Sequence, residues 1–179
     1  MGGGRLEGMA NSSDILIDAF SRIRDTVHSA VRGLDEETLA TKPDDGGNSI
    51  AWLVWHLTRV QDDHVAEVAG GDQVWTDEGW ADRFGLPFDD ADTGYGHSAD
   101  DVAAVRGLSA EQLTGYHDAV AERTTAYLRE LDEDDLDRIV DEEWDPPVTL
   151  AVRLVSVVND DTQHAGQASF LRGILTRRD

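Results

Sequence analysis

Apolar residues recur at intervals of three and four along most of this 179-residue chain. This spacing places them on one face of an α-helix, and it predicts four long amphipathic helices. The predicted segments are Ser12 or Ser13 to about Leu34, Ile50 to about Ala69, Ser109 to about Leu131, and Thr149 to about Thr176. The sequence shows no convincing strand alternation and no internal repeat. The pattern therefore predicts an all-α fold, a four-helix bundle with a long loop between the second and third helices.

Capping and turn residues mark several of these boundaries. Ser109 and Gln112 have the spacing of a capping box at the start of the third helix. Gly70 is placed to end the second helix in a left-handed conformation. Pro146 and Pro147 exclude a helix in the acidic segment before the fourth.

The predicted loop, residues 72–108, is rich in glycine, aspartate and aromatic residues. A connection of this length is rarely idle in a compact domain, so we expect a functional or packing role for it. Residues 12–179 are predicted to form one domain, and the Gly-rich residues 1–11 are predicted to be a flexible tail.

The composition restricts the function. The formal net charge is −22, and a field of that sign repels phosphate backbones, so we expect no binding to nucleic acid. No apolar run is long enough to cross a membrane, and no signal-peptide pattern is present, so we expect no membrane association. The chain has no cysteine, which excludes disulfides, thiolate metal sites and a cysteine nucleophile. We therefore expect a cytoplasmic, acidic protein.

Polar residues interrupt the apolar face of the fourth helix in the stretch SVVNDDTQHAGQASFLRGIL. Asp160 and His164 are four residues apart, so they differ by only about 40° around the helix, and they are predicted to point toward the bundle axis. His56 lies on or beside the apolar face of the second helix. Taken alone, a buried neutral histidine would explain His56, but a carboxylate buried opposite it needs a cation or a donor. A divalent metal ion held by His56, Asp160 and His164 would satisfy all three groups.

The other histidines carry weaker signals. His64 lies two turns after His56 but among acidic residues, which suggests a solvent-exposed helix end. His97, in GYGHS, is a loop residue that could line a pocket. His28 and His117 lie in helices of mixed polarity, and no chemical role is assigned to them.

The segments AWLVWHL and DDTQHAGQ resemble the DinB/YfiT-like superfamily of metal-binding four-helix bundles. The pattern of that superfamily is a histidine in the second helix and H-x-x-x-H-x-G-Q in the last. His56 matches the first position, and His164, Gly166 and Gln167 match the end of the second motif. The resemblance covers the chain from about residue 12. The stretch GGDQVWTDEGWADRFGLP is similar to a thiol-dependent subgroup that includes mycothiol transferases.

One position departs from that pattern, because Asp160 stands where the superfamily has its first histidine of the last helix. Aspartate is a competent ligand, and two histidines with one carboxylate leave coordination positions open. Zn²⁺ is the expected metal, with Ni²⁺, Mn²⁺ and Fe²⁺ as alternatives. Asp161 in place of Asp160 as the ligand, or loss of metal binding altogether, are the competing interpretations.

The resemblance implies a metal-dependent S-transferase that uses mycothiol or a similar low-molecular-weight thiol against small electrophiles, in detoxification or a stress response. The alternatives are a non-catalytic bundle that binds a small molecule or is related to stress, and a metal-assisted hydrolase that uses the same site. No protein side chain is assigned as a catalytic acid or base.

Helical spacing places further residues near the predicted ligands. Trp52 is a first candidate for a pocket wall, and Arg59 and Gln167 are candidates for orienting substrate. Packing and surface charge are the competing explanations for these three residues. An exposed apolar helix face could pair with a second copy, so a homodimer is also an expectation.

Overall fold

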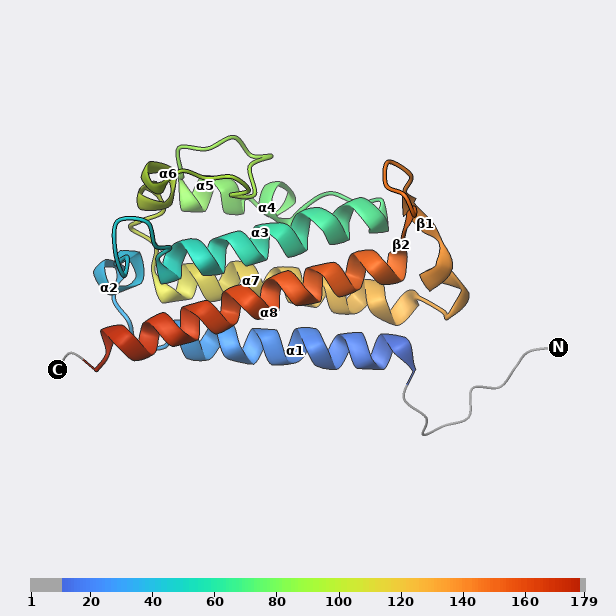
Figure 1. Cartoon of the computed structure of the whole chain (residues 1–179), viewed down its shortest axis with the longest axis horizontal. Coiled ribbons are helices and arrows are strands. Elements are labelled where there is room, and N and C mark those ends of the chain that lie inside the picture. The colour runs from blue at the N-terminus through green and yellow to red at the C-terminus, as the bar shows by residue number, and fades with distance from the viewer. Residues whose placement is uncertain (1–10, 178–179) are drawn as a thin grey trace.

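The structure, a computed structural model, describes residues 11–177 and confirms the all-α bundle (Figure 1). Its four long helices are α1 (Ser12–Val31), α3 (Ile50–Ala69), α7 (Ala110–Glu130) and α8 (Leu150–Leu175). The helix α8 packs mainly against α1 and α3, and α7 packs against the same two helices from the other side. Within residues 11–177, no helix combines the length and apolarity needed to cross a membrane.

Short elements fill the connections. They are α2 (Glu36–Ala40), α4 (Val74–Asp77), α5 (Trp80–Phe84), α6 (Ala99–Ala104), the 3₁₀ helix η1 (Asp134–Asp137), β1 (Ile139–Asp141) and β2 (Val148–Thr149). The helices α4 to α6 belong to the long segment that was predicted as a loop. β1 and β2 pair antiparallel around the proline segment, with Ile139 opposite Thr149. This hairpin was not predicted, because strands of two and three residues are too short to show an alternating pattern.

The helix boundaries follow the capping chemistry closely. Ser109 and Gln112 form the predicted capping box of α7, and Gly70 ends α3 in the left-handed conformation. The start of α1 differs by one residue from the prediction, because Asn11 is the N-cap and exchanges hydrogen bonds with Asp14. Asn11 is thus part of the helix cap, and the rest of the predicted flexible tail lies outside the described residues.

The helix α3 is buried on almost every side, unlike a typical amphipathic surface helix. α7 and α8 flank it, and the segment that carries α4 and α5 runs along its remaining face (Figure 1). Asp62 of α3 anchors this segment, since its carboxylate accepts hydrogen bonds from the backbone N–H groups of Val74 and Trp75 at 2.9 and 2.8 Å. Polar side chains on α3 must therefore find partners within the protein.

Candidate metal centre

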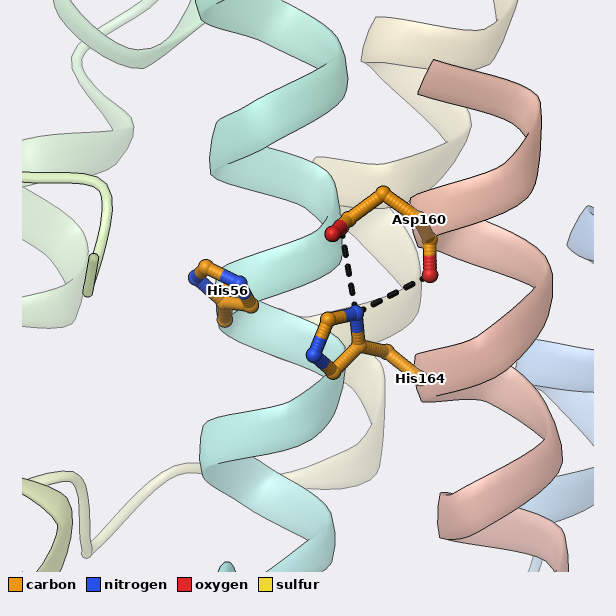
Figure 2. A group of neighbouring side chains, drawn as sticks. All are labelled: His56, Asp160 and His164. Atoms are coloured by element: carbon orange, nitrogen blue, oxygen red, sulfur yellow. Dashed lines mark hydrogen bonds and ion pairs between the residues drawn. The ribbon is translucent and has the colours of Figure 1, made fainter. Parts of the chain in front are cut away.

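Three potential ligands meet in the seam between α3 and α8. Figure 2 shows His56 on α3 and Asp160 and His164 on α8, with the side chains directed toward one another. Each offers one ligand atom, and these atoms all lie within 4.8 Å of one another. The two imidazole rings are 4.7 Å apart between centroids and nearly perpendicular, at 80°. Within residues 11–177, no second group of three or more histidine or acidic side chains comes this close together.

The structure separates the two neighbouring aspartates of α8. Asp161 lies on the fully buried stripe of the helix with Val157 and Leu171. Asp160 and His164 lie beside this stripe and face α3, with side chains 34% and 18% exposed. The sequence predicted that this pair points to the bundle axis. In the structure the pair is rotated away from the axis by part of a helical turn, and Asp161 points inward instead. Asp160, rather than Asp161, meets the two histidines.

Hydrogen bonds select the tautomer of both rings. Nδ1 of His56 lies 2.5 Å from the carbonyl oxygen of Thr93. Nδ1 of His164 lies 2.9 Å from the carbonyl oxygen of Asp160 and 3.1 Å from its Oδ2. A carbonyl oxygen can only accept, so each Nδ1 carries a proton, and in the neutral ring each Nε2 presents a lone pair. This second bond to an imidazole is the usual companion of metal ligation by histidine.

The pKa values of the three groups follow from their burial and their contacts with one another. Burial lowers the pKa of His56, against the opposing effect of its hydrogen bond to Thr93, so this ring is neutral at pH 7. Burial would raise the pKa of Asp160, but the hydrogen bond and charge of His164 lower it below its ordinary value. Burial would likewise lower the pKa of His164, and its bond to Asp160 raises it instead. Two imidazoles and an ionised carboxylate are a donor set that fits Zn²⁺ or a similar divalent ion.

A hollow of about 330 Å³ opens on this group. Besides His56 and Asp160, its walls include Asp63, His64 and Tyr95. Nδ1 of His64 accepts a hydrogen bond from the guanidinium of Arg153 at 2.9 Å, so the ring is oriented from outside the hollow. A small molecule that enters the hollow therefore contacts His56 and Asp160, two of the three candidate ligands.

The three predicted substrate-binding residues do not line this hollow. Trp52 is buried and stacks on the ring of His56, with centroids 4.6 Å apart. Arg59 has no exposed surface, and its guanidinium donates to the carbonyl oxygens of Asp90 and Asp92 at 3.0 and 3.2 Å. Gln167 is exposed on α8. Their roles in substrate binding stay predictions, and the contacts of Arg59 give it a structural part in fixing the loop.

The backbone of the loop contributes to the site in a way that the sequence did not predict. Thr93 acts through its carbonyl, which no residue type reveals. Gly94 has a φ of +89°, and a Cβ at this position would lie 2.9 Å from Nδ1 of His56 and 2.9 Å from the ring of Trp55. The glycines of TGYGH were the available signal, since glycine allows both this conformation and so close an approach.

Comparisons with known proteins agree with the fold and with the family resemblance. A model of the mycothiol S-transferase family matches residues 15–177, in accord with the resemblance to the DinB/YfiT-like superfamily. A crystal structure described as the conserved protein of locus from Enterococcus faecalis is similar over 94% of this chain and 99% of its own, with a TM-score of 0.88 and 26% sequence identity. A search of curated proteins found no match.

Proposed function

Since the chain belongs to the mycothiol S-transferase family, we propose that it transfers a low-molecular-weight thiol of the mycothiol type to small electrophiles, using a divalent metal ion held by His56, Asp160 and His164. The observation that carries the proposal is the convergence of these three side chains beside an open hollow. A divalent metal ion held by these residues would lower the pKa of a bound thiol, so that the thiolate would be available near neutral pH.

The residues of the chain account for the other requirements. His56 and His164 would hold the ion as neutral donors, and Asp160 would supply one negative charge, so the site with a divalent ion would keep a net charge of +1 that favours a thiolate. Because the described residues contain no cysteine, the attacking sulfur comes from the cosubstrate. The hollow beside Asp63, His64 and Tyr95 is the space in which the thiol and the electrophile would meet.

The test begins with protein purified without added metal. We expect stoichiometric Zn²⁺, or a related divalent ion, by elemental analysis, and thiol-dependent consumption of a generic electrophile such as monobromobimane with mycothiol. His56→Ala and His164→Ala should each lose the metal and the activity, while His28→Ala, on α1, should keep both.

A Co²⁺-substituted protein gives a more direct readout, because thiolate ligation changes its absorption spectrum. A shift on addition of mycothiol supports the proposal. If metal is bound stoichiometrically but no thiol changes this spectrum, the transferase function is wrong. Protein without any metal would favour the non-catalytic alternative.

A further inference from the structure

Trp52 contacts both candidate histidine ligands. Its indole lies four residues before His56 on α3 and is stacked on that ring, with centroids 4.6 Å apart and an interplanar angle of 13°. It also meets His164 edge-on, with centroids 6.3 Å apart. The side chain is 6% exposed. The position of this indole therefore limits the positions that the two imidazoles can take.

His97 holds the polar edge of that indole. Nε1 of Trp52 donates a hydrogen bond to Nδ1 of His97 at 3.1 Å. Because an indole nitrogen can only donate, Nδ1 of His97 carries a lone pair and the proton is on Nε2. Nε2 lies 3.1 Å from both carboxylate oxygens of Asp92, to which it donates. The tautomer of His97 is thus set by a donor on one side and an acceptor on the other.

The ring of His97 has little freedom to turn. It stacks on Trp55 at 5.7 Å and contacts Phe88 at 4.6 Å between ring centroids. Asp92 is fixed in turn, because the backbone N–H of Gly94 donates to its Oδ1 at 2.7 Å. Burial would raise the pKa of Asp92, but the hydrogen bonds from Gly94 and His97 lower it below its ordinary value, so Asp92 is an ionised acceptor.

We propose that His97, oriented by Asp92, is a positioning residue for the candidate metal centre: it fixes Trp52 against His56, and so presets the His56 ring for ligation. His97 does not act on substrate, since its ring nitrogens are both engaged with Trp52 and Asp92. The loop then holds His56 in two ways, at Nδ1 through the Thr93 carbonyl and on its ring face through His97 and Trp52. The choice of metal affinity as one readout rests on the proposed function.

The test compares two variants of the full chain. His97→Phe keeps an aromatic ring against Trp55 and Phe88 but removes the acceptor. His97→Asn restores an acceptor oxygen at about the position of Nδ1. Zn²⁺ affinity is measured by competition with a chelator, and we expect His97→Phe to weaken it about 10- to 100-fold, the range found for outer-shell partners of metal ligands. His97→Asn should recover most of the loss, and His28→Phe is the matched control.

A second readout needs no metal. In the metal-free protein, the stacked indole should move the NMR signals of the His56 ring protons upfield, and the His97→Phe variant should lose this shift while the His97→Asn variant keeps it. If wild-type protein binds no Zn²⁺, the proposed function fails, and this readout still decides the role of His97.

Three results would overturn the proposal. These are a ring-proton shift that survives in His97→Phe, a Zn²⁺ affinity within about twofold of wild type in that variant, and equal losses in His97→Phe and His97→Asn. Should His97→Phe not fold, Trp52→Phe removes the same hydrogen bond from the other side. It should weaken Zn²⁺ binding to a similar degree, and an unchanged affinity would again overturn the proposal.

Discussion

The helix α3 directs polar side chains toward both α7 and α8, and their hydrogen bonding differs between these two interfaces. Toward α7 and α4, the carboxylate of Asp62 accepts from the backbone N–H groups of Val74 and Trp75 and from the hydroxyl of Tyr116 at 2.8 Å. The guanidinium of Arg59 lies 3.7 Å from the same carboxylate and donates to Gln73 and to two loop carbonyls. Arg59, Asp62 and Tyr116 are buried, and each has hydrogen-bond partners within the protein.

Toward α8, the hydrogen bonds do not occupy every nitrogen of the two histidines. The Nδ1 atoms of His56 and His164 are occupied, but their Nε2 atoms have lone pairs and no donor within the described part of the chain. Beside them, a hollow gives access from solvent. The difference between the two groups is chemical: Arg59 and Asp62 spend their donors and acceptors on partners inside the protein, whereas the three candidate ligands lie close together and keep lone pairs beside a hollow.

The largest expected effect on stability comes from removing the buried guanidinium of Arg59 beside Asp62. Arg59→Met leaves Asp62 buried without its opposite charge and leaves several acceptors without a donor. We expect the free energy of unfolding to fall by about 3–5 kcal/mol, measured by urea denaturation. Arg59→Lys keeps the positive charge but loses the planar set of donors of the guanidinium. Its free energy of unfolding should therefore lie between those of wild type and Arg59→Met. A loss below about 1 kcal/mol in Arg59→Met would show that this interface is not held by Arg59.

The α7 side of α3 also contains a group that makes the stability of the fold depend on pH. His117 of α7 is fully buried, and burial lowers its pKa from 6.5 to about 4. The folded state therefore binds this proton less readily than the unfolded state does, so stability is full above pH 6.5 and falls as the pH drops toward 4. The difference amounts to about 3 kcal/mol over that range.

The measurement is the free energy of unfolding of wild type and His117→Met at pH 7.5 and pH 5. The free energy of unfolding should decrease less between pH 7.5 and pH 5 in His117→Met than in wild type. The control His28→Gln, at a half-exposed position, should show the full decrease. The same decrease in wild type and His117→Met would assign the pH dependence to other groups.

The smallest effect sharpens the contrast between two adjacent carboxylates. Both oxygens of Asp161 are buried without a hydrogen-bond partner in the described residues, and burial, with the charge of Asp160 nearby, raises its pKa well above the ordinary value. Asp161→Asn removes a carboxyl group that folding must either bury as an anion or protonate, so we expect a gain of about 1–3 kcal/mol in stability at pH 7.5, with Zn²⁺ affinity unchanged. Asp160→Asn should instead weaken Zn²⁺ binding. Reversed effects on metal affinity would exchange the two assignments.

The sequence predicted the bundle well because local signals mark its ends. The bounds of α3 were predicted correctly, since a capping serine and a glycine flank it. The ligand group was predicted from the four-residue spacing of Asp160 and His164, but spacing alone could not choose between Asp160 and Asp161. That choice depends on how far α8 is rotated against α3, which is set by packing along the whole seam.

The loop was the least predictable part for a different reason. Its contribution to the site depends on a main-chain carbonyl and on contacts between residues far apart in the sequence, such as Trp52 with His97. Neither has a local pattern. The unusual length of the segment was a valid sign that it had a role, but the identity of that role required its path over α3.

The hydrogen bond that orients His56 ends on the backbone of residue 93, and this has a consequence for how the protein can vary. An exchange of the threonine side chain leaves the carbonyl oxygen in place, so this hydrogen bond does not depend on the residue type at position 93. A deletion or insertion in the stretch that brings the chain over α3 would move the oxygen itself. Affinity for a metal ion could therefore be tuned by loop length while every ligand stays the same.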